Sequence, residues 1–196
     1  MRRIITAIMA IAMLSTMMTA QETGKPEKWN TPYPVQRVEG EVFAGLPFPA
    51  DSYHGATAKP GLQLGAAIRY NFTGTPFDVG LQFDYTIVNH GNIQSENCYG
   101  GQTNTLLSLT ATGAYNFRQG HNVNPFAGIG MGFARMHVDQ GYPYPVNGYN
   151  FLLVPKIGCE FWGLFRVYAS AHVIRKGFNS LEIGIGVVLG GRPKRK

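Results

Sequence analysis

Two neighbouring segments in the first half of the chain alternate between apolar and polar residues. Every second residue is apolar from residue 62 to residue 72, and the alternation resumes from residue 77 to residue 88. A period of two is typical of β-strands, whose successive side chains point to opposite faces. The residues between the segments, Thr73 to Pro76, include a glycine and a proline, as in a turn. The pattern therefore predicts a β-hairpin with strands of about eleven residues, the length that a tilted strand needs to cross a bilayer.

The same alternation predicts six further strands. They cover about residues 35–47, 103–117, 123–138, 150–161, 165–173 and 180–189. The connections alternate between long and short, except for a short last one, so all the long ones lie on one side. Strands in hydrocarbon must form a closed sheet, because every backbone N–H and C=O needs a partner within the protein. We therefore expect an all-β fold, an eight-stranded antiparallel up-and-down transmembrane β-barrel.

The N-terminus has the features of a secretory signal peptide. Two arginines follow Met1, then an apolar run from Ile4 to Leu14, then Ser15 to Ala20, which ends in a cleavage site whose Met18 is larger than the usual residue there. The apolar run is shorter than the roughly 18 residues of a membrane-spanning helix. We expect a signal peptide at 1–20, a polar, proline-rich periplasmic linker at 21–34, the barrel at 35–190 and a basic tail at 191–196.

The positive charge of the chain is concentrated at its ends. There are 17 Lys and Arg residues against 11 Asp and Glu residues, a net charge of +6, and four of the last five residues are basic. The barrel itself is therefore close to neutral. No stripe of interleaved basic and aromatic residues accompanies the tail, so we expect no binding of nucleic acid.

The polar face of the predicted strands carries charged side chains that would face the barrel interior. An eight-stranded barrel is just wide enough to be filled by side chains. We therefore expect an interior charge network rather than an ion path, since unpaired charges there would be costly. The network comprises Glu39, Glu41, Arg69, Asp78, Asp84, Lys156, Glu160, Arg166, His172 and Glu182. A narrow porin-like channel is the alternative.

Alternation alone would also fit a soluble barrel of inverted polarity, with an apolar interior and a lipocalin-like ligand. Aromatic residues near the strand ends favour the membrane, because such residues form belts at both interfaces. These residues are Tyr70, Phe72, Phe77, Tyr115, Phe117, Phe161 and Trp162.

The last predicted strand contains a polar-x-Gly-x-x-apolar-x-apolar pattern, made by Glu182, Gly184, Val187 and Leu189. On this pattern and the strand order, residues 35–189 resemble the small eight-stranded outer-membrane β-barrels, the porin-like group similar to the OmpA transmembrane domain and OmpX. The resemblance implies a location in the cell outer membrane and a C-terminal assembly signal recognised by the barrel assembly machinery. It also implies a monomer surrounded by outer-membrane lipid and lipopolysaccharide.

Candidate catalytic chemistry is sparse. Ser170 and His172 lie two residues apart on one face, with Glu182 on the next strand, but lipid A deacylases embedded in barrels have the opposite His-x-Ser order. The other histidines lack the spacing of metal ligands, and the Gly-x-Gly-x-Gly at 128–132 lacks the helix of a dinucleotide site. We expect no enzymatic activity, metal or cofactor, and keep a barrel-embedded lipid A-modifying hydrolase as an alternative.

The long connections are where function would reside. Tyr142 and Tyr144 alternate with prolines in one of them, which makes a stiff, aromatic segment able to contact an extracellular glycan or protein. Cys98 lies in another long connection, far from Cys159 near the opposite end of a strand, so we expect no disulfide between them. The sequence thus predicts a structural or surface-interaction role with little or no conductance.

Overall fold

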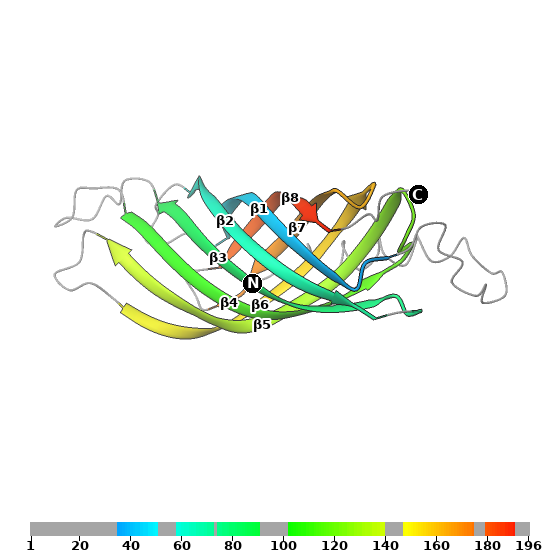
Figure 1. Cartoon of the computed structure of the whole chain (residues 1–196). Coiled ribbons are helices and arrows are strands. Elements are labelled where there is room, and N and C mark those ends of the chain that lie inside the picture. Colours follow the sequence, from blue (N-terminus) through cyan, green and yellow to red (C-terminus); the bar gives the residue numbers. More distant parts are fainter. Residues whose placement is uncertain are drawn as a thin grey trace, which may run out of the picture. The chain divides into compact units, whose positions relative to one another are not determined.

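The computed structural model describes residues 35–50, 58–72, 74–90, 102–139, 147–174 and 179–190. They form one closed barrel in which each strand pairs antiparallel with the next and β8 pairs with β1 (Figure 1). The strands are β1 (Val38–Pro49), β2 (Ala58–Asn71), β3 (Phe77–His90), β4 (Gln102–Asn116), β5 (Val123–Asp139), β6 (Asn147–Phe161), β7 (Phe165–His172) and β8 (Ser180–Leu189). The predicted fold class is confirmed. Among the described residues, no helix is long and apolar enough to cross a membrane.

The strand register defines the tilt of the barrel. A line across the sheet from Arg37, just before β1, passes through every strand and returns to β1 at Pro47, ten residues farther along. The shear number is therefore 10 for eight strands, which corresponds to a strand tilt of about 35–45°. Each residue then advances roughly 2.4 Å along the barrel axis.

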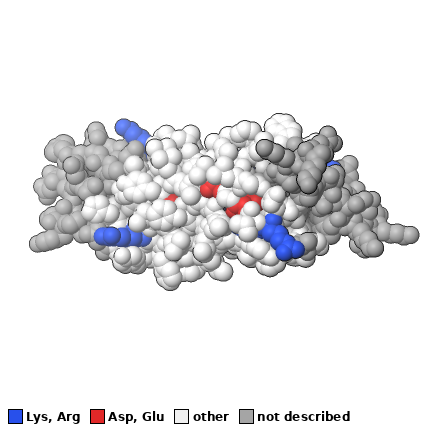
Figure 2. Space-filling model, in the orientation of Figure 1, with Lys and Arg blue, Asp and Glu red and all other residues white. Residues whose placement is uncertain are grey.

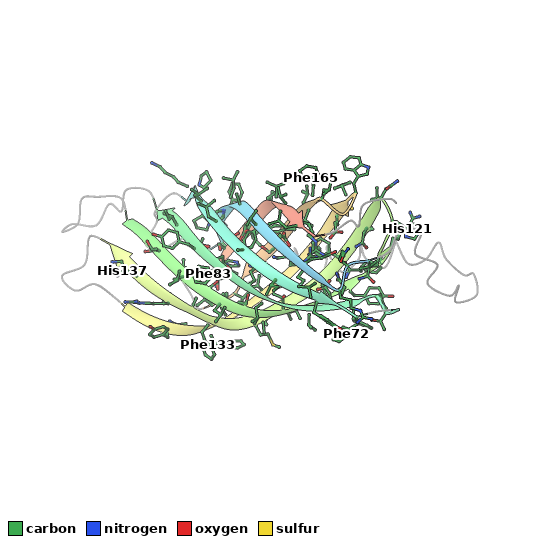
Figure 3. The ribbon with its side chains drawn as sticks, in the orientation of Figure 1. Phe72, Phe83, His121, Phe133, His137 and Phe165 are labelled. Atoms are coloured by element: carbon green, nitrogen blue, oxygen red, sulfur yellow. The ribbon has the colours of Figure 1, made fainter. Side chains whose placement is uncertain are left out.

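The two faces of the sheet have opposite polarity. Outward residues such as Leu81 and Ile183 are 53% and 60% exposed, whereas inward Asp84 and Glu182 are 0% and 1% exposed. Phe72, Phe133 and Phe165 likewise point away from the barrel (Figure 3). Burying charge inside and presenting apolar residues outside is the arrangement of a barrel that faces lipid, and the inverse of a lipocalin.

One end of the barrel, which we call the turn end, carries the connections at residues 72–76, 117–122 and 162–164. Aromatic rings gather around it in edge-to-face pairs, with ring centroids 5.3 Å apart for Phe77 and Tyr115 and 5.4 Å apart for Tyr70 and Phe72. Such a ring of aromatic side chains is expected at a membrane interface. The opposite end, the loop end, carries the remaining connections.

Exposed charge is confined to the two ends. Among the residues whose burial is described, the exposed charged side chains are Arg37 and Arg118 at the turn end and Lys59 and Arg135 at the loop end. In Figure 2 most of the described surface is uncharged, with cations toward the ends and only small acidic patches between them. The outer surface therefore consists of an apolar band bounded by cations.

The strand boundaries differ slightly from those expected. β1 continues to Pro49 instead of stopping at Pro47, because it pairs with β8 as far as Ser180, although its pairing with β2 ends at Gly45. β6 begins at Asn147, since it pairs with β5 as far as His137. The pairing of β6 with β7 is shorter than its pairing with β5. It ends at Lys156 and Ser170, with one more bridge between Leu153 and Val173. The β5–β6 hairpin therefore extends beyond β7.

Candidate functional site

The candidate site is the barrel interior, where the structure places all ten residues of the predicted charge network. They lie on the inward face of β1, β2, β3, β6, β7 and β8, and most are less than 7% exposed, while Lys156 and Glu160 are largely buried. From the turn end to the loop end they form successive layers, which we name after their main residues.

The amide layer lies nearest the turn end. The Asn116 side-chain amide donates to Asp78 Oδ2 at 2.6 Å, Asn124 donates to Asn116 at 3.1 Å, and Gln119 donates to Asn71 at 3.3 Å. These amides come from four different segments of the barrel. They connect its interior through neutral groups and supply a donor to the carboxylate of Asp78.

The arginine layer comes next and contains three carboxylates around two guanidinium groups. Arg69 lies 3.3 Å from Glu39, 3.7 Å from Glu41 and 3.6 Å from Glu160. Arg166 donates to Glu160 at 2.8 Å and lies 3.7 Å from Glu41. Because each arginine contacts more than one carboxylate, the layer is a branched network that holds β1, β2, β6 and β7 together.

The aromatic layer occupies the middle of the barrel. The Lys156 ammonium donates to Gln82 Oε1 at 2.7 Å and lies 4.4 Å from the centroid of the Tyr168 ring. The Phe43 ring stands edge-to-face against Tyr168, with centroids 6.0 Å apart. No carboxylate among the described residues lies within ion-pair distance of Lys156. Its positive charge is compensated instead by an amide oxygen and two ring faces.

The histidine layer follows toward the loop end. His172 Nε2 lies 3.4 Å from Glu182 Oε2, and the Tyr168 hydroxyl donates to Glu182 Oε1 at 3.2 Å. Asp84 accepts from Gln82 at 3.0 Å and from Thr86 at 3.4 Å. The Ser170 hydroxyl is buried and makes no hydrogen bond. Serine, histidine and glutamate are therefore close together, but the serine is not hydrogen-bonded to the histidine as an activated nucleophile would be.

An apolar layer closes the described interior at the loop end. It consists of Val88, Leu106, Ala134, Met136, Leu152 and Val154, with Ile174 packed against them. This layer was not predicted from the sequence, although its residues occupy inward positions of their strands. The signal that could have found it is the change from polar to apolar residues at inward positions beyond Thr86 in β3 and before Lys156 in β6.

Little space remains between these layers. One interior cavity, lined by residues that include Glu41, Arg69, Lys156 and Arg166, has a volume of only about 30 Å³. A cavity of that size holds about one water molecule. At the level of the arginine layer, the interior is thus filled by its own side chains.

Comparison with known proteins agrees with this architecture. No protein-family model matches the sequence, and no curated protein matches it. The structure is similar to that of Neisserial surface protein A, with a TM-score of 0.50 and 16% identity over 80% of this chain and 98% of that one. The chain has the fold of the small outer-membrane β-barrels.

Two further barrels align over similar lengths. The N-terminal barrel domain of Pseudomonas aeruginosa OprF aligns at TM-score 0.48 and 16% identity, covering 80% of this chain and 100% of that domain. Ail, the attachment invasion locus protein of Yersinia pestis, aligns at TM-score 0.49 and 14% identity, covering 78% of this chain and 97% of that one.

The remaining predicted residues lie on β6 and β8 or outside the described residues. Within the predicted assembly signal, Glu182 and Gly184 face the interior, whereas Val187 and Leu189 are exposed on the outer face of β8. Tyr142, Tyr144 and Cys98 lie outside the described residues, as do the predicted signal peptide and basic tail. Cys159 is a free thiol on β6. Within the described part of the chain, no cluster of His, Cys, Asp and Glu side chains could hold a metal ion.

Proposed function

We propose that the protein is an integral, non-enzymatic β-barrel of the cell outer membrane, with a structural or surface-interaction role and little or no conductance. The observation that carries this proposal is the filled interior, in which the cavity at the arginine layer measures only about 30 Å³. A conducting barrel needs a continuous aqueous path, and larger barrels than this one provide it.

The apolar layer adds a second barrier to ions. Met136 and Leu152 are fully buried between the loop end and the charged layers. Apolar constrictions exclude ions because they do not replace the hydration shell. A narrow channel would have to pass both this layer and the arginine layer.

Planar-bilayer recording tests the sealed state. We expect no discrete conductance steps from the purified protein, and none from Arg166→Ala alone, since the apolar layer remains in place. A stable conductance in the unmodified protein that changes with Arg166→Ala would favour the channel instead.

The interior also argues against the enzymatic alternative. Ser170, His172 and Glu182 are 6%, 2% and 1% exposed and face the inside, where a lipid substrate has no access. Mass spectrometry of lipid A from cells with and without the protein is the corresponding test. A difference in acylation that disappears with His172→Ala would establish a hydrolase.

Membrane insertion has its own test. Fractionation of the cell envelope should find the protein in the outer membrane, and the detergent-extracted barrel should change its gel mobility on boiling. We expect both, because the outward face of every strand is apolar between the two ends. A protein that is soluble without detergent and shows no mobility shift would contradict the proposal.

The surface role is assigned to the loop end. The β5–β6 hairpin extends beyond β7, and Tyr149 near its end is 75% exposed. The connection above it contains Tyr142 and Tyr144, which we propose as contacts for an extracellular glycan or protein. Loss of binding to host-cell glycans or matrix proteins in Tyr142→Ser/Tyr144→Ser, with unchanged gel mobility, would support this role.

A further inference from the structure

An open apolar groove of about 790 Å³ lies on the outer surface of β3, β4 and β5 near the turn end. Its sides include Phe77, Val79, Tyr115 and Ile129, and its floor is formed by Gly113 and Ala127. Its volume is in the range of small-molecule sites. Its lining also includes Asp78, Ala114 and Gly128, which occupy inward positions of the same strands.

The groove exists because two outward positions carry very small residues between large ones. Gly113 and Ala127 are adjacent to Val79 and Tyr115, respectively, in the strand register. A Cβ atom added at Gly113 would meet only the Asp78 carbonyl oxygen, at 3.9 Å. The space above Gly113 is therefore open to the outside and is not occupied by a neighbouring side chain.

The surroundings of the groove indicate an amphiphilic occupant. Most of its lining is apolar, and it faces the region that the proposed function assigns to lipid. At the turn end of the barrel, the lining of the groove includes Thr75. The exposed Arg118 lies in the turn that joins β4 and β5. None of the described carboxylates pairs with Arg118. The groove is thus apolar, and two of its strands, β4 and β5, are joined by a turn that carries an exposed cation. This arrangement matches an acyl chain whose phosphate group lies toward the turn end.

We propose that this groove binds one acyl chain of a phospholipid in the periplasmic leaflet, whose phosphate lies near Arg118. The inference rests on the proposed function, because it requires the outer face to lie in a membrane with the turn end toward the periplasm. A second copy of the chain is a poorer occupant, since a two-fold contact centred here would place one concave surface against another.

Native mass spectrometry of the protein purified in mild detergent from the envelope of expressing cells tests the proposal. We expect the unmodified protein to retain one diacyl phospholipid. The Cβ of Gly113→Leu meets only the Asp78 carbonyl oxygen, at 3.9 Å, and its side chain extends into the groove. The variant should reduce retention about tenfold, because the leucine takes the place of part of the acyl chain and removes about ten of its dispersion contacts. Arg118→Gln should reduce it about two- to fivefold, as for a single exposed ion pair.

Gly40→Leu is the matched control, because Gly40 is also an outward glycine and its added Cβ would meet only Leu189 Cβ, at 3.8 Å. It should retain lipid as the unmodified protein does. Ala127→Leu provides a second groove-filling variant if Gly113→Leu fails to fold, and the mobility shift on boiling reports folding for each.

Equal lipid retention in the unmodified protein and the groove-filling variants would overturn the proposal, as would equal loss in Gly40→Leu. A bound mass of lipid A instead of a diacyl lipid would overturn the assignment to the periplasmic leaflet. A dimer that Gly113→Leu dissociates would identify a second copy as the occupant. If the unmodified protein neither enters the envelope nor shifts on boiling, the proposed function fails and the lipid site with it. Lipid loss in a correctly inserted variant concerns the groove alone.

Discussion

Lys156 on β6 donates a hydrogen bond of 2.7 Å to the side-chain oxygen of Gln82 on β3, across the barrel interior. Its ammonium also lies over the rings of Tyr168 and Phe43, at 4.4 Å and 5.4 Å from their centroids. Arg166, by contrast, lies 2.8 Å from the carboxylate of Glu160. The two buried cations therefore have different partners, and their removal should have different consequences.

We expect Lys156→Met to lower the free energy of unfolding by about 1–2 kcal/mol. The substitution leaves the Gln82 oxygen without its donor, but methionine fills a similar volume between the two rings. Urea unfolding in lipid vesicles, followed by tryptophan fluorescence, measures the change.

Arg166→Met is the comparison and should cost about 3–5 kcal/mol. It removes a partner from Glu41 and Glu160 and leaves the three carboxylates of the layer around the single guanidinium group of Arg69. Equal losses in the two variants would contradict the distinction, and would mean that Lys156 compensates the interior carboxylates at longer range.

Gly184 on β8 is required by the close approach of Tyr168. A Cβ atom at Gly184 would overlap the Tyr168 ring, whose hydroxyl donates to Glu182 at 3.2 Å. We expect Gly184→Ala to destabilise the barrel by about 1–3 kcal/mol through overpacking. Gly40→Ala, where the outward space is open, should change stability by less than about 1 kcal/mol.

A double variant separates packing from other roles of Gly184. If the ring contact is the cause, Gly184→Ala combined with Tyr168→Leu should lose less stability than the sum of the two single variants. Strict additivity, together with reduced insertion in cells, would point to recognition of Gly184 by the assembly machinery.

The strands and their faces were predictable, because alternation along each strand depends on that strand alone. Phe77 to Ile87 is an example, since its outward residues are apolar and its inward residues, apart from Gly80, are polar. The ten charged residues of the interior were predictable for the same reason.

The contacts within the interior were not predictable from alternation. Lys156 and Gln82 are 74 residues apart and lie on strands that are not neighbours, so their contact depends on the shear of the closed barrel. The apolar layer and the outer groove likewise depend on how neighbouring strands are aligned. Only the register shows that Met136 lies at the depth of Leu106, and Gly113 at a depth similar to that of Ala127.

Met136 tests the packing of the apolar layer. It is fully buried at the loop end, whereas Met131 on the same strand is 52% exposed on the outer face. We expect Met136→Ala to cost about 2–5 kcal/mol, because it leaves a cavity in the interior. Met131→Ala should cost about 1 kcal/mol or less, since lipid fills the space that the side chain leaves.

Both variants should be measured in vesicles by the same unfolding assay. If Met136→Ala were as mild as Met131→Ala, the interior at the loop end would be loosely packed. The proposal of a sealed barrel would then lose its second barrier.

Charge on the outer face distinguishes a barrel in lipid from one in water. Leu81 is the middle one of the outward residues from Phe77 to Tyr85 and is 53% exposed, while Tyr149 lies near the loop end and is 75% exposed. Arginine at the bilayer midplane costs about 2–4 kcal/mol, but only about 0–1 kcal/mol near an interface. We therefore expect Leu81→Arg to destabilise the vesicle-embedded barrel strongly and Tyr149→Arg to have little effect. If this face were in water, both positions would accept arginine at low cost, because both are exposed. Similar small losses of stability for the two variants in vesicles would therefore place this face outside the hydrocarbon.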